Sequence, residues 1–248
     1  MAQQEDDGSA TSRRSPAMIA DKIAQVNARI ASACAAARRP VQSVTLLAVS
    51  KTFGFDAVAA AHAAGQHRFG ENYVQEALAK IASAHALSPA PEWHLIGPLQ
   101  ANKTRAVAAS FDWVHSIDRL ALAERLSAQR AEGAGPLSVC LQVNISGEAS
   151  KSGVAPGDVA PLAHAVAALP RLRLRGLMAI PAPAVGIDAQ RAPYRALREC
   201  LEALRAQGLD LDTLSAGMSD DLEAAVLEGA TIVRVGSAIF GSRSPGGR

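Results

Sequence analysis

Residues 213–241 read TLSAGMSDDLEAAVLEGATIVRVGSAIFG and contain the unit from which the whole fold can be built. Two short runs of strand type, 213–218 and 231–236, flank a stretch with helical character at 220–228. Parallel strands need a long crossover connection, which is usually a helix. The quoted stretch therefore predicts a strand, a covering helix and a second strand parallel to the first.

The same alternation of strand and helix is found in the chain before residue 213. Eight strands with helical connections in one domain favour a closed TIM (β/α)8 barrel, of the α/β class, over an open doubly wound sheet. The other predicted strands are 44–50, 67–70, 93–97, 113–118, 138–144 and 172–180. The other predicted covering helices are 55–64, 73–86, 101–109, 119–132, 157–169 and 189–207.

An additional helix is predicted before the first strand. Ser15 followed by Pro16 is a helix start, and Ile19, Ile23, Val26 and Ile30 then recur on one face. We expect residues 1–15 to form a disordered tail and residues 16–243 to form a single barrel domain.

Composition excludes several classes of protein. The chain has 25 Lys+Arg and 23 Asp+Glu, a net charge of +2, which argues against a nucleic-acid-binding protein with a clustered basic surface. Residues 1–15 are polar and lack the apolar segment of a secretory signal, and no stretch approaches the roughly 20 apolar residues needed to span a bilayer. Three scattered cysteines are typical of a reducing compartment. We expect a cytoplasmic protein with no membrane and no nucleic-acid partner.

The loops after the last two strands of such barrels often bind phosphate. Ser219, as the N-cap of the helix that follows, and the pair Gly236 and Ser237 occupy those loops. For either loop alone, ordinary turn chemistry is the simpler interpretation. Their coincidence at both positions favours a phosphate site.

Lys51 ends the first apolar strand and has two interpretations. It could be a rim lysine with its ammonium in water, or an amine partly removed from water and able to form a Schiff base. The rim interpretation is the more common for a lone lysine. A phosphate site at the same barrel mouth changes the balance, because pyridoxal phosphate requires both a lysine and a phosphate site.

Several ordered stretches carry a resemblance to one known family. The main ones are LLAVSKT (46–52), FGENYVQE (69–76), WHLIGPLQANK (93–103), VHSID (114–118), QVN (142–144), RGLM (175–178), residues 215–221 and residues 233–241. Over about residues 17 to 243, the chain resembles the pyridoxal-phosphate homeostasis protein family. These proteins are single-domain relatives of the alanine racemase N-terminal barrel.

The resemblance implies that pyridoxal 5′-phosphate (PLP) is the cofactor and that Lys51 carries it as N6-(pyridoxal phosphate)lysine, a Schiff base. It also implies roles for six other residues. These are Ser219, Gly236 and Ser237 on the phosphate, Asn72 and Met178 beside the ring, and Arg234 facing the pyridine nitrogen. Ala216 departs from the family pattern, which usually has a larger residue such as methionine there. We expect this change to alter packing beside the phosphate loop and to leave the phosphate contacts in place.

A cationic Arg234 beside the ring nitrogen would disfavour its protonation and weaken the ring as an electron sink. Alanine racemase, by resemblance, takes a tyrosine base from a separate C-terminal β-domain, which we do not expect in a chain that ends at Arg248. Tyr73 and Tyr194 fall in predicted helices. We therefore expect a protein of PLP homeostasis that holds PLP with little or no turnover.

We expect this carrier to be a monomer or weak dimer that supplies PLP to apo PLP-dependent enzymes. Two alternatives remain. One is a PLP-dependent amino-acid racemase, and the other is a Schiff-base aldolase or isomerase acting on a sugar phosphate.

Other polar residues have simpler expected roles. His94 and His115 are expected to be hydrogen-bonded core histidines with no metal, and Asp220 and Asp221 to complement a helix dipole. The loop after the fifth strand is expected to close with an ion pair between Glu148 and Lys151, near Gly153. We also expect Gln100, Asn102 and Lys103 to open a helix near the barrel mouth.

Overall fold

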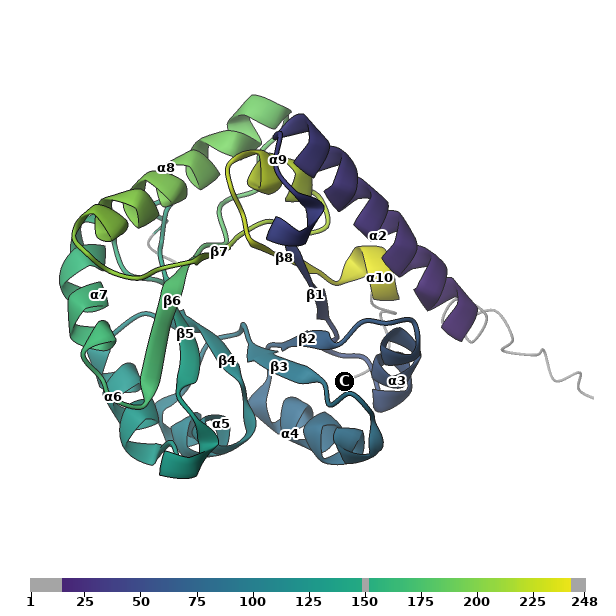
Figure 1. Cartoon of the computed structure of the whole chain (residues 1–248), viewed down its shortest axis with the longest axis horizontal. Helices are drawn as coiled ribbons and strands as arrows, with labels where there is room; N and C mark the ends of the chain where they lie inside the picture. Colours follow the sequence, from purple (N-terminus) through teal and green to yellow (C-terminus); the bar gives the residue numbers. More distant parts are fainter. Residues whose placement is uncertain (1–14, 149–151, 242–248) are drawn as a thin grey trace, which may run out of the picture.

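Eight short parallel strands form a closed barrel at the centre of the molecule (Figure 1). The computed structural model describes residues 15–148 and 152–241. Each strand pairs with the next one along the chain, and β8 pairs with β1 to close the barrel. The strands are β1 (Thr45–Val49), β2 (Arg68–Glu71), β3 (Glu92–Leu95), β4 (Trp113–Ile117), β5 (Leu137–Gln142), β6 (Leu172–Met178), β7 (Thr213–Ser215) and β8 (Ile232–Val235). Closure confirms the predicted (β/α)8 barrel and rules out the open sheet.

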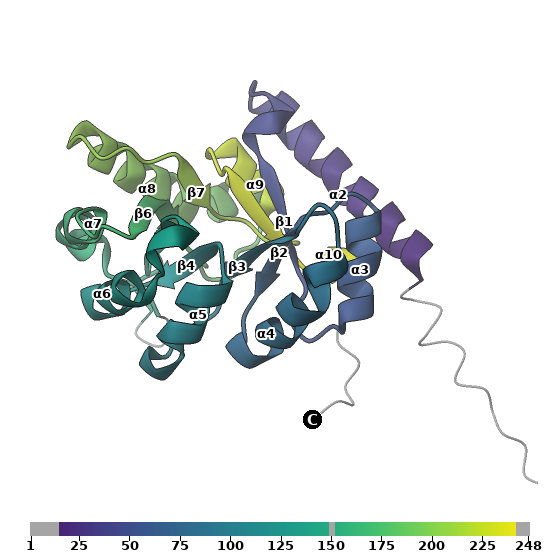
Figure 2. The ribbon, with the colours of Figure 1, turned by 60° about the horizontal axis from the view of Figure 1, so that its bottom comes forward.

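Helices surround the strands in both views of the ribbon (Figures 1 and 2). Among the described residues, no helix is long and apolar enough to cross a membrane. The helices are α2 (Pro16–Ala36), α3 (Phe55–Ala63), α4 (Val74–Ser83), α5 (Thr104–Ser110), α6 (Leu120–Gln129), α7 (Val159–Ala167), α8 (Ile187–Ala206), α9 (Leu222–Leu227) and α10 (Ser237–Phe240).

The predicted additional helix is α2, which packs against α3, α9 and α10 outside the barrel. Ser15 caps it by accepting a hydrogen bond from the backbone N of Met18 over 3.3 Å, and Pro16 occupies its first turn. The isoleucines and valine predicted to share one face are buried. Of the predicted tail, residues 1–14 lie outside the described residues, as do residues 149–151, 242 and 243 of the predicted domain.

Alternation along the strands separates the outer core from the barrel interior. On β1, Leu46 and Ala48 belong to the large apolar cluster that includes residues of the surrounding helices, whereas Leu47 and Val49 belong to a smaller cluster. The other members of the smaller cluster are Ile96, Trp113, Cys140, Met178 and Ile232. Because parallel strands all point the same way, this filled interior separates two mouths, one at each set of strand ends.

The predicted boundaries differ from the structure mainly near β7. The predicted strand 213–218 is only three residues long, because Gly217 has φ +90° and turns the chain out of the strand. The predicted helix 101–109 begins instead with a 3-10 turn, Ala101–Lys103, before α5. These differences shift elements by a few residues and leave the order of the strands unchanged.

Candidate functional site

A cavity of about 300 Å³ opens at the C-terminal ends of the strands. Residues that follow β1, β2, β7 and β8 meet there, as expected for a barrel of this kind. Six of the seven predicted site residues line this cavity, namely Lys51, Asn72, Ser219, Arg234, Gly236 and Ser237. The structure therefore brings together side chains from opposite ends of the sequence.

Lys51 lies in a tight turn directly after β1. The backbone N of Phe53 donates to the carbonyl of Ser50 over 3.1 Å and closes the turn. Thr52 has φ +69°, a left-handed conformation that is uncommon for a β-branched residue. Its backbone N donates to Glu76 Oε1 over 2.6 Å. The turn that carries Lys51 is thus held in an unusual conformation by a carboxylate from α4.

A network of ion pairs and hydrogen bonds, centred on the buried Lys80, supports the same turn. Lys80 Nζ donates to the carbonyl of Ser50 over 2.7 Å, to Glu71 Oε1 over 2.7 Å and to Glu76 Oε1 over 2.6 Å. Ser50 Oγ also donates to Glu71 Oε1, over 2.6 Å. Burial raises the pKa of Glu71, and the hydrogen bonds from Lys80 and Ser50 partly offset this effect. The network connects the turn after β1 with β2 and α4.

Sequence reasoning missed this network. Glu76 and Lys80 are four residues apart on α4, a spacing that indicates an ion pair on one helix face. The buried Glu71 could not be joined to them without knowing how α4 packs against β2. The only sequence feature that indicated a role for Glu71 was the position of this carboxylate at the end of an apolar strand.

Two serine hydroxyls converge on one side of the cavity. Ser237 Oγ donates to Ser219 Oγ over 3.0 Å, and the backbone N of Ala238 donates to the same oxygen over 3.4 Å. At Gly236, a Cβ atom would lie 3.1 Å from the carbonyl oxygen of Val49, so glycine allows this close approach of β8 to β1. Hydroxyl and backbone N–H donors therefore gather where two loops meet.

The loop after β7 is held from both sides. The Asp221 carboxylate accepts from the backbone N of Met218 over 2.6 Å and from Tyr194 Oη over 2.6 Å. The prediction that Ser219 caps the following helix is wrong, because α9 begins at Leu222 with Asp221 in the N-cap position. Ser219 lies before that turn, which leaves its hydroxyl directed to Ser237.

Arg234 lines the cavity from β8 although it is only 3% exposed. Its Nη1 donates to Ser215 Oγ over 2.8 Å, and its Nη2 donates to the carbonyl of Ala179 over 2.9 Å. Burial lowers the pKa of the guanidinium. An arginine pKa lies so far above neutrality that this lowered value still leaves a fixed positive charge at the base of the cavity.

The two residues predicted beside the ring occupy different places. Asn72 lines the cavity, and its buried Oδ1 has no hydrogen-bond partner among the described residues. Gly97 makes room for it, because a Cβ at 97 would collide with the backbone of Asn72. Met178 is fully buried in the inner apolar cluster with Val49 and Ile96, which line the cavity, and is not itself a lining residue.

Comparison with known proteins places this chain in a family. The family model for the alanine racemase N-terminal domain matches residues 24–244. A pyridoxal phosphate homeostasis protein of Pseudomonas aeruginosa is 60% identical over 92% of this chain and 97% of its own length. The chain belongs to the pyridoxal phosphate homeostasis protein family. A second member, from Escherichia coli, is 51% identical over 91% of this chain and 97% of its own length.

Solved structures agree with this family assignment. PipY of Synechococcus elongatus, whose structure has PLP bound, superimposes with a TM-score of 0.78 at 38% identity and covers 90% of this chain and 100% of its own. Alanine racemase of Corynebacterium glutamicum shares the barrel with a TM-score of 0.65 at 19% identity, over 92% of this chain and 61% of its own. The second likeness shows the fold alone.

The residues predicted to open a helix near the barrel mouth lie beside the main cavity. Gln100 and Lys103 line a neighbouring cavity of about 350 Å³ together with Asn72 and Tyr73. Asn102 lies in the 3-10 turn between them.

Two further expectations concern acidic residues. Asp220 lines the main cavity, while Asp221 holds the loop through its side chain instead of merely complementing the dipole of α9. Glu148 accepts from Asn144 Nδ2 through its carbonyl oxygen over 2.8 Å, close to Gly153. Lys151, its predicted ion-pair partner, lies outside the described residues.

Proposed function

We propose that this protein binds PLP at the C-terminal mouth of the barrel, holds it as a Schiff base on Lys51 and serves intracellular PLP homeostasis. The observation that carries the proposal is that Lys51, the hydroxyl pair of Ser219 and Ser237, and the charged Arg234 line one cavity. A lysine, an anion site and a ring partner are the three features that PLP requires. PipY of Synechococcus elongatus, solved with PLP bound, supports the choice of cofactor.

The residues of the cavity fit the parts of PLP. Ser219 Oγ, Ser237 Oγ and the Ala238 N–H form a cluster suited to phosphate oxygens, with Gly236 allowing close backbone approach. The buried Asn72 amide has an oxygen without a partner among the described residues and is available to a polar group of the ring. Arg234 would face the pyridine nitrogen.

Lys51 would supply the covalent link. Its neutral amine adds to the PLP aldehyde, a C=N bond forms, and the aldehyde oxygen leaves as water with the two amine protons. The turn that carries Lys51 is fixed by Glu76 and Lys80, so the amine is presented from a rigid support.

Low turnover is part of the proposal. A guanidinium facing the ring nitrogen keeps that nitrogen unprotonated, which weakens its ability to withdraw electrons from a bound amino acid. Neither tyrosine lines the cavity, since Tyr194 is buried and donates to Asp221, and Tyr73 lines the neighbouring cavity. We propose that the bound PLP is handed to apo PLP-dependent enzymes.

The test is an absorption spectrum of the purified protein with PLP, before and after borohydride. We expect a visible band that borohydride removes, with the label covalently attached to Lys51 by peptide mapping. Lys51→Ala should lose the band, while Lys103→Ala, which removes a lysine from the neighbouring cavity, should keep it. A reducible band that survives in Lys51→Ala would overturn the assignment.

Two further outcomes separate the alternatives. Racemisation of a panel of amino acids at about 1–1000 per second would identify a PLP-dependent racemase instead of a carrier. A wild-type protein that acquires no band with PLP, but is trapped on Lys51 by borohydride with a sugar phosphate, would identify a Schiff-base aldolase or isomerase.

A further inference from the structure

Five polar side chains form a continuous hydrogen-bonded chain through the barrel interior. Arg234 Nη1 lies 2.8 Å from Ser215 Oγ, which lies 2.8 Å from His115 Nδ1. His115 Nε2 lies 2.8 Å from His94 Nδ1, and His94 Nε2 lies 2.7 Å from Glu92 Oε1. The residues come from β8, β7, β4 and β3, and the three central ones are at most 1% exposed. We refer to these five residues as the relay.

The chemistry of the two ends and the neutral charge of the two histidines together fix the direction of every bond. A carboxylate can only accept, so a neutral His94 carries its proton on Nε2, donates to Glu92 and accepts at Nδ1. His115 then donates from Nε2 to His94 and accepts at Nδ1 from the Ser215 hydroxyl. Ser215 Oγ in turn accepts from Arg234, because a guanidinium can only donate. All four bonds therefore run from the cation to the anion.

The electrostatic surroundings support neutral histidines in the relay. Burial lowers the pKa of His115, and His94 and Arg234 lower it further. Burial also lowers the pKa of His94, which faces Glu92, Asp112 and Arg68. The hydrogen bond from His94 lowers the pKa of Glu92, so its carboxylate stays ionised. Two neutral histidines between a cationic arginine and an anionic carboxylate are the charge states that the direction of the bonds requires.

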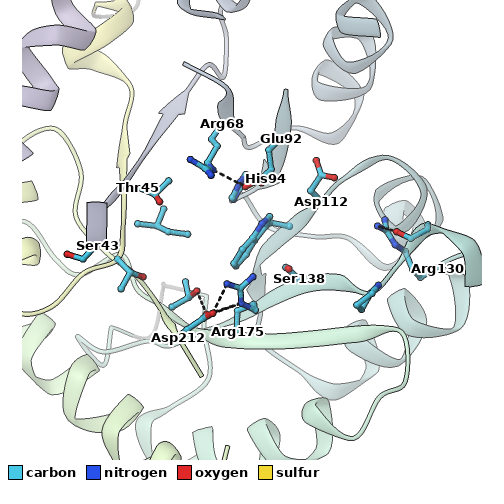
Figure 3. Close-up of a pocket in the computed structure, with 16 residues that line it drawn as sticks. Ser43, Thr45, Arg68, Glu92, His94, Asp112, Arg130, Ser138, Arg175 and Asp212 are labelled. Atoms are coloured by element: carbon cyan, nitrogen blue, oxygen red, sulfur yellow. Dashed lines mark hydrogen bonds and ion pairs between the residues drawn. The ribbon is translucent and has the colours of Figure 1, made fainter. Parts of the chain in front are cut away.

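The two ends of the relay lie at opposite mouths of the barrel. Arg234 lines the cavity proposed for PLP. Glu92 lines a separate cavity of about 580 Å³ at the N-terminal ends of the strands, where Arg68 lies 3.4 Å from it (Figure 3). The same cavity holds a second acidic group, Asp212, paired with Arg175 over 2.6 Å and outside the relay.

We propose that Ser215, His115, His94 and Glu92 are positioning residues for Arg234, and that the relay transmits a change of charge at Glu92 to the cofactor site at the other mouth. The inference rests on the proposed function. Hydrogen bonds aligned in one direction polarise one another, so the carboxylate makes each acceptor along the relay stronger. Ser215 Oγ and the carbonyl of Ala179 then hold the guanidinium in one orientation toward the ring nitrogen.

The tautomers of the two histidines test the relay without any cofactor. Long-range ¹H–¹⁵N NMR of the histidine-labelled protein should show both His94 and His115 neutral, with the proton on Nε2, throughout the neutral pH range. Ser215→Ala should leave this pattern in His94 and change the Nδ1 signal of His115. A proton on Nδ1 of either ring, or a cationic ring at neutral pH, would overturn the proposal.

Transmission is tested by comparing two carboxylates of the same cavity. Glu92→Gln keeps an acceptor for His94 and removes the charge, and Asp212→Asn makes the same change outside the relay. We expect Glu92→Gln to weaken PLP binding by about two- to tenfold and to move the absorption band of the bound cofactor, with Asp212→Asn close to wild type. Equal behaviour of the two variants would overturn transmission. A wild-type protein that binds no PLP would instead overturn the proposed function.

Discussion

Arg29 on α2 donates from Nη2 to the carbonyl oxygen of Ser219 over 2.9 Å. The same guanidinium holds Glu223 on α9 through two bonds, from Nε over 2.7 Å and from Nη2 over 2.8 Å. The helix that precedes the barrel is therefore tied directly to the loop that presents the Ser219 hydroxyl. This contact gives α2 a role at the proposed phosphate site in addition to covering the outside of the barrel.

Arg29→Met should weaken PLP binding by about two- to fivefold, because it removes a partly exposed contact that fixes the Ser219 loop. Isothermal titration with PLP measures the change. Glu223→Gln is the matched control, since it removes the charge of the pair while Arg29 can still reach Ser219. If Glu223→Gln weakens binding as much as Arg29→Met, the ion pair is responsible and the contact with Ser219 is not.

Lys80→Met should destabilise the fold by about 3–5 kcal/mol, because it leaves the fully buried Glu71 carboxylate without its cation. Urea unfolding followed by circular dichroism measures this loss. The double variant Lys80→Met/Glu71→Gln should recover part of it, because the uncompensated charge is gone. A single variant within about 1 kcal/mol of wild type would show that Lys80 is not the main partner of Glu71.

The pattern along the chain is enough to predict the barrel and the position of its site. Alternating strands and helices predict the order of the elements, and the loops after β1, β7 and β8 must meet at one mouth because the strands are parallel. The sequence alone therefore places Lys51, Ser219 and Ser237 in one region. Their assigned roles come from the resemblance to a family.

The contacts that hold the site could not be predicted, because they depend on the register between strands. Ser215 meets His115 across the barrel although these residues are 100 positions apart in the sequence. Which residues of β4 and β7 point inward at the same level follows from the shear of the closed barrel, which no single strand reveals. The prediction that His94 and His115 are hydrogen-bonded core residues is confirmed, but their partners were not foreseen.

The buried histidines should make stability fall as the pH drops below about 6.5. Burial lowers the pKa of both His94 and His115, so on acidification the unfolded chain binds protons before the folded one does. The free energy of unfolding should then decrease by about 1.4 kcal/mol per pH unit for each proton bound only by the unfolded chain. Urea unfolding between pH 7 and about 5 measures the slope. His115→Gln should reduce it, and an unchanged slope in that variant would contradict the assignment.

The charge of Glu228 should affect stability at a lower pH than the buried histidines do. Burial alone would raise the pKa of Glu228, but hydrogen bonds from Arg191 and Arg195 on α8 outweigh burial and hold the pKa below its usual range. A carboxyl with a lowered folded pKa stabilises the protein above its unfolded pKa, about 4.3, and loses that contribution as the pH falls through the folded value.

Glu228→Gln should therefore be less stable than wild type at pH 7, with a difference that shrinks below about pH 4.3. Thermal unfolding of both proteins across this range measures the difference. Glu202→Gln is the matched control, because Glu202 is an exposed partner of Arg198 on the same helix, and it should change stability by less than about 1 kcal/mol. If the difference between Glu228→Gln and wild type stays constant from pH 7 to pH 3, packing around residue 228 determines its contribution to stability, and the charge of Glu228 does not.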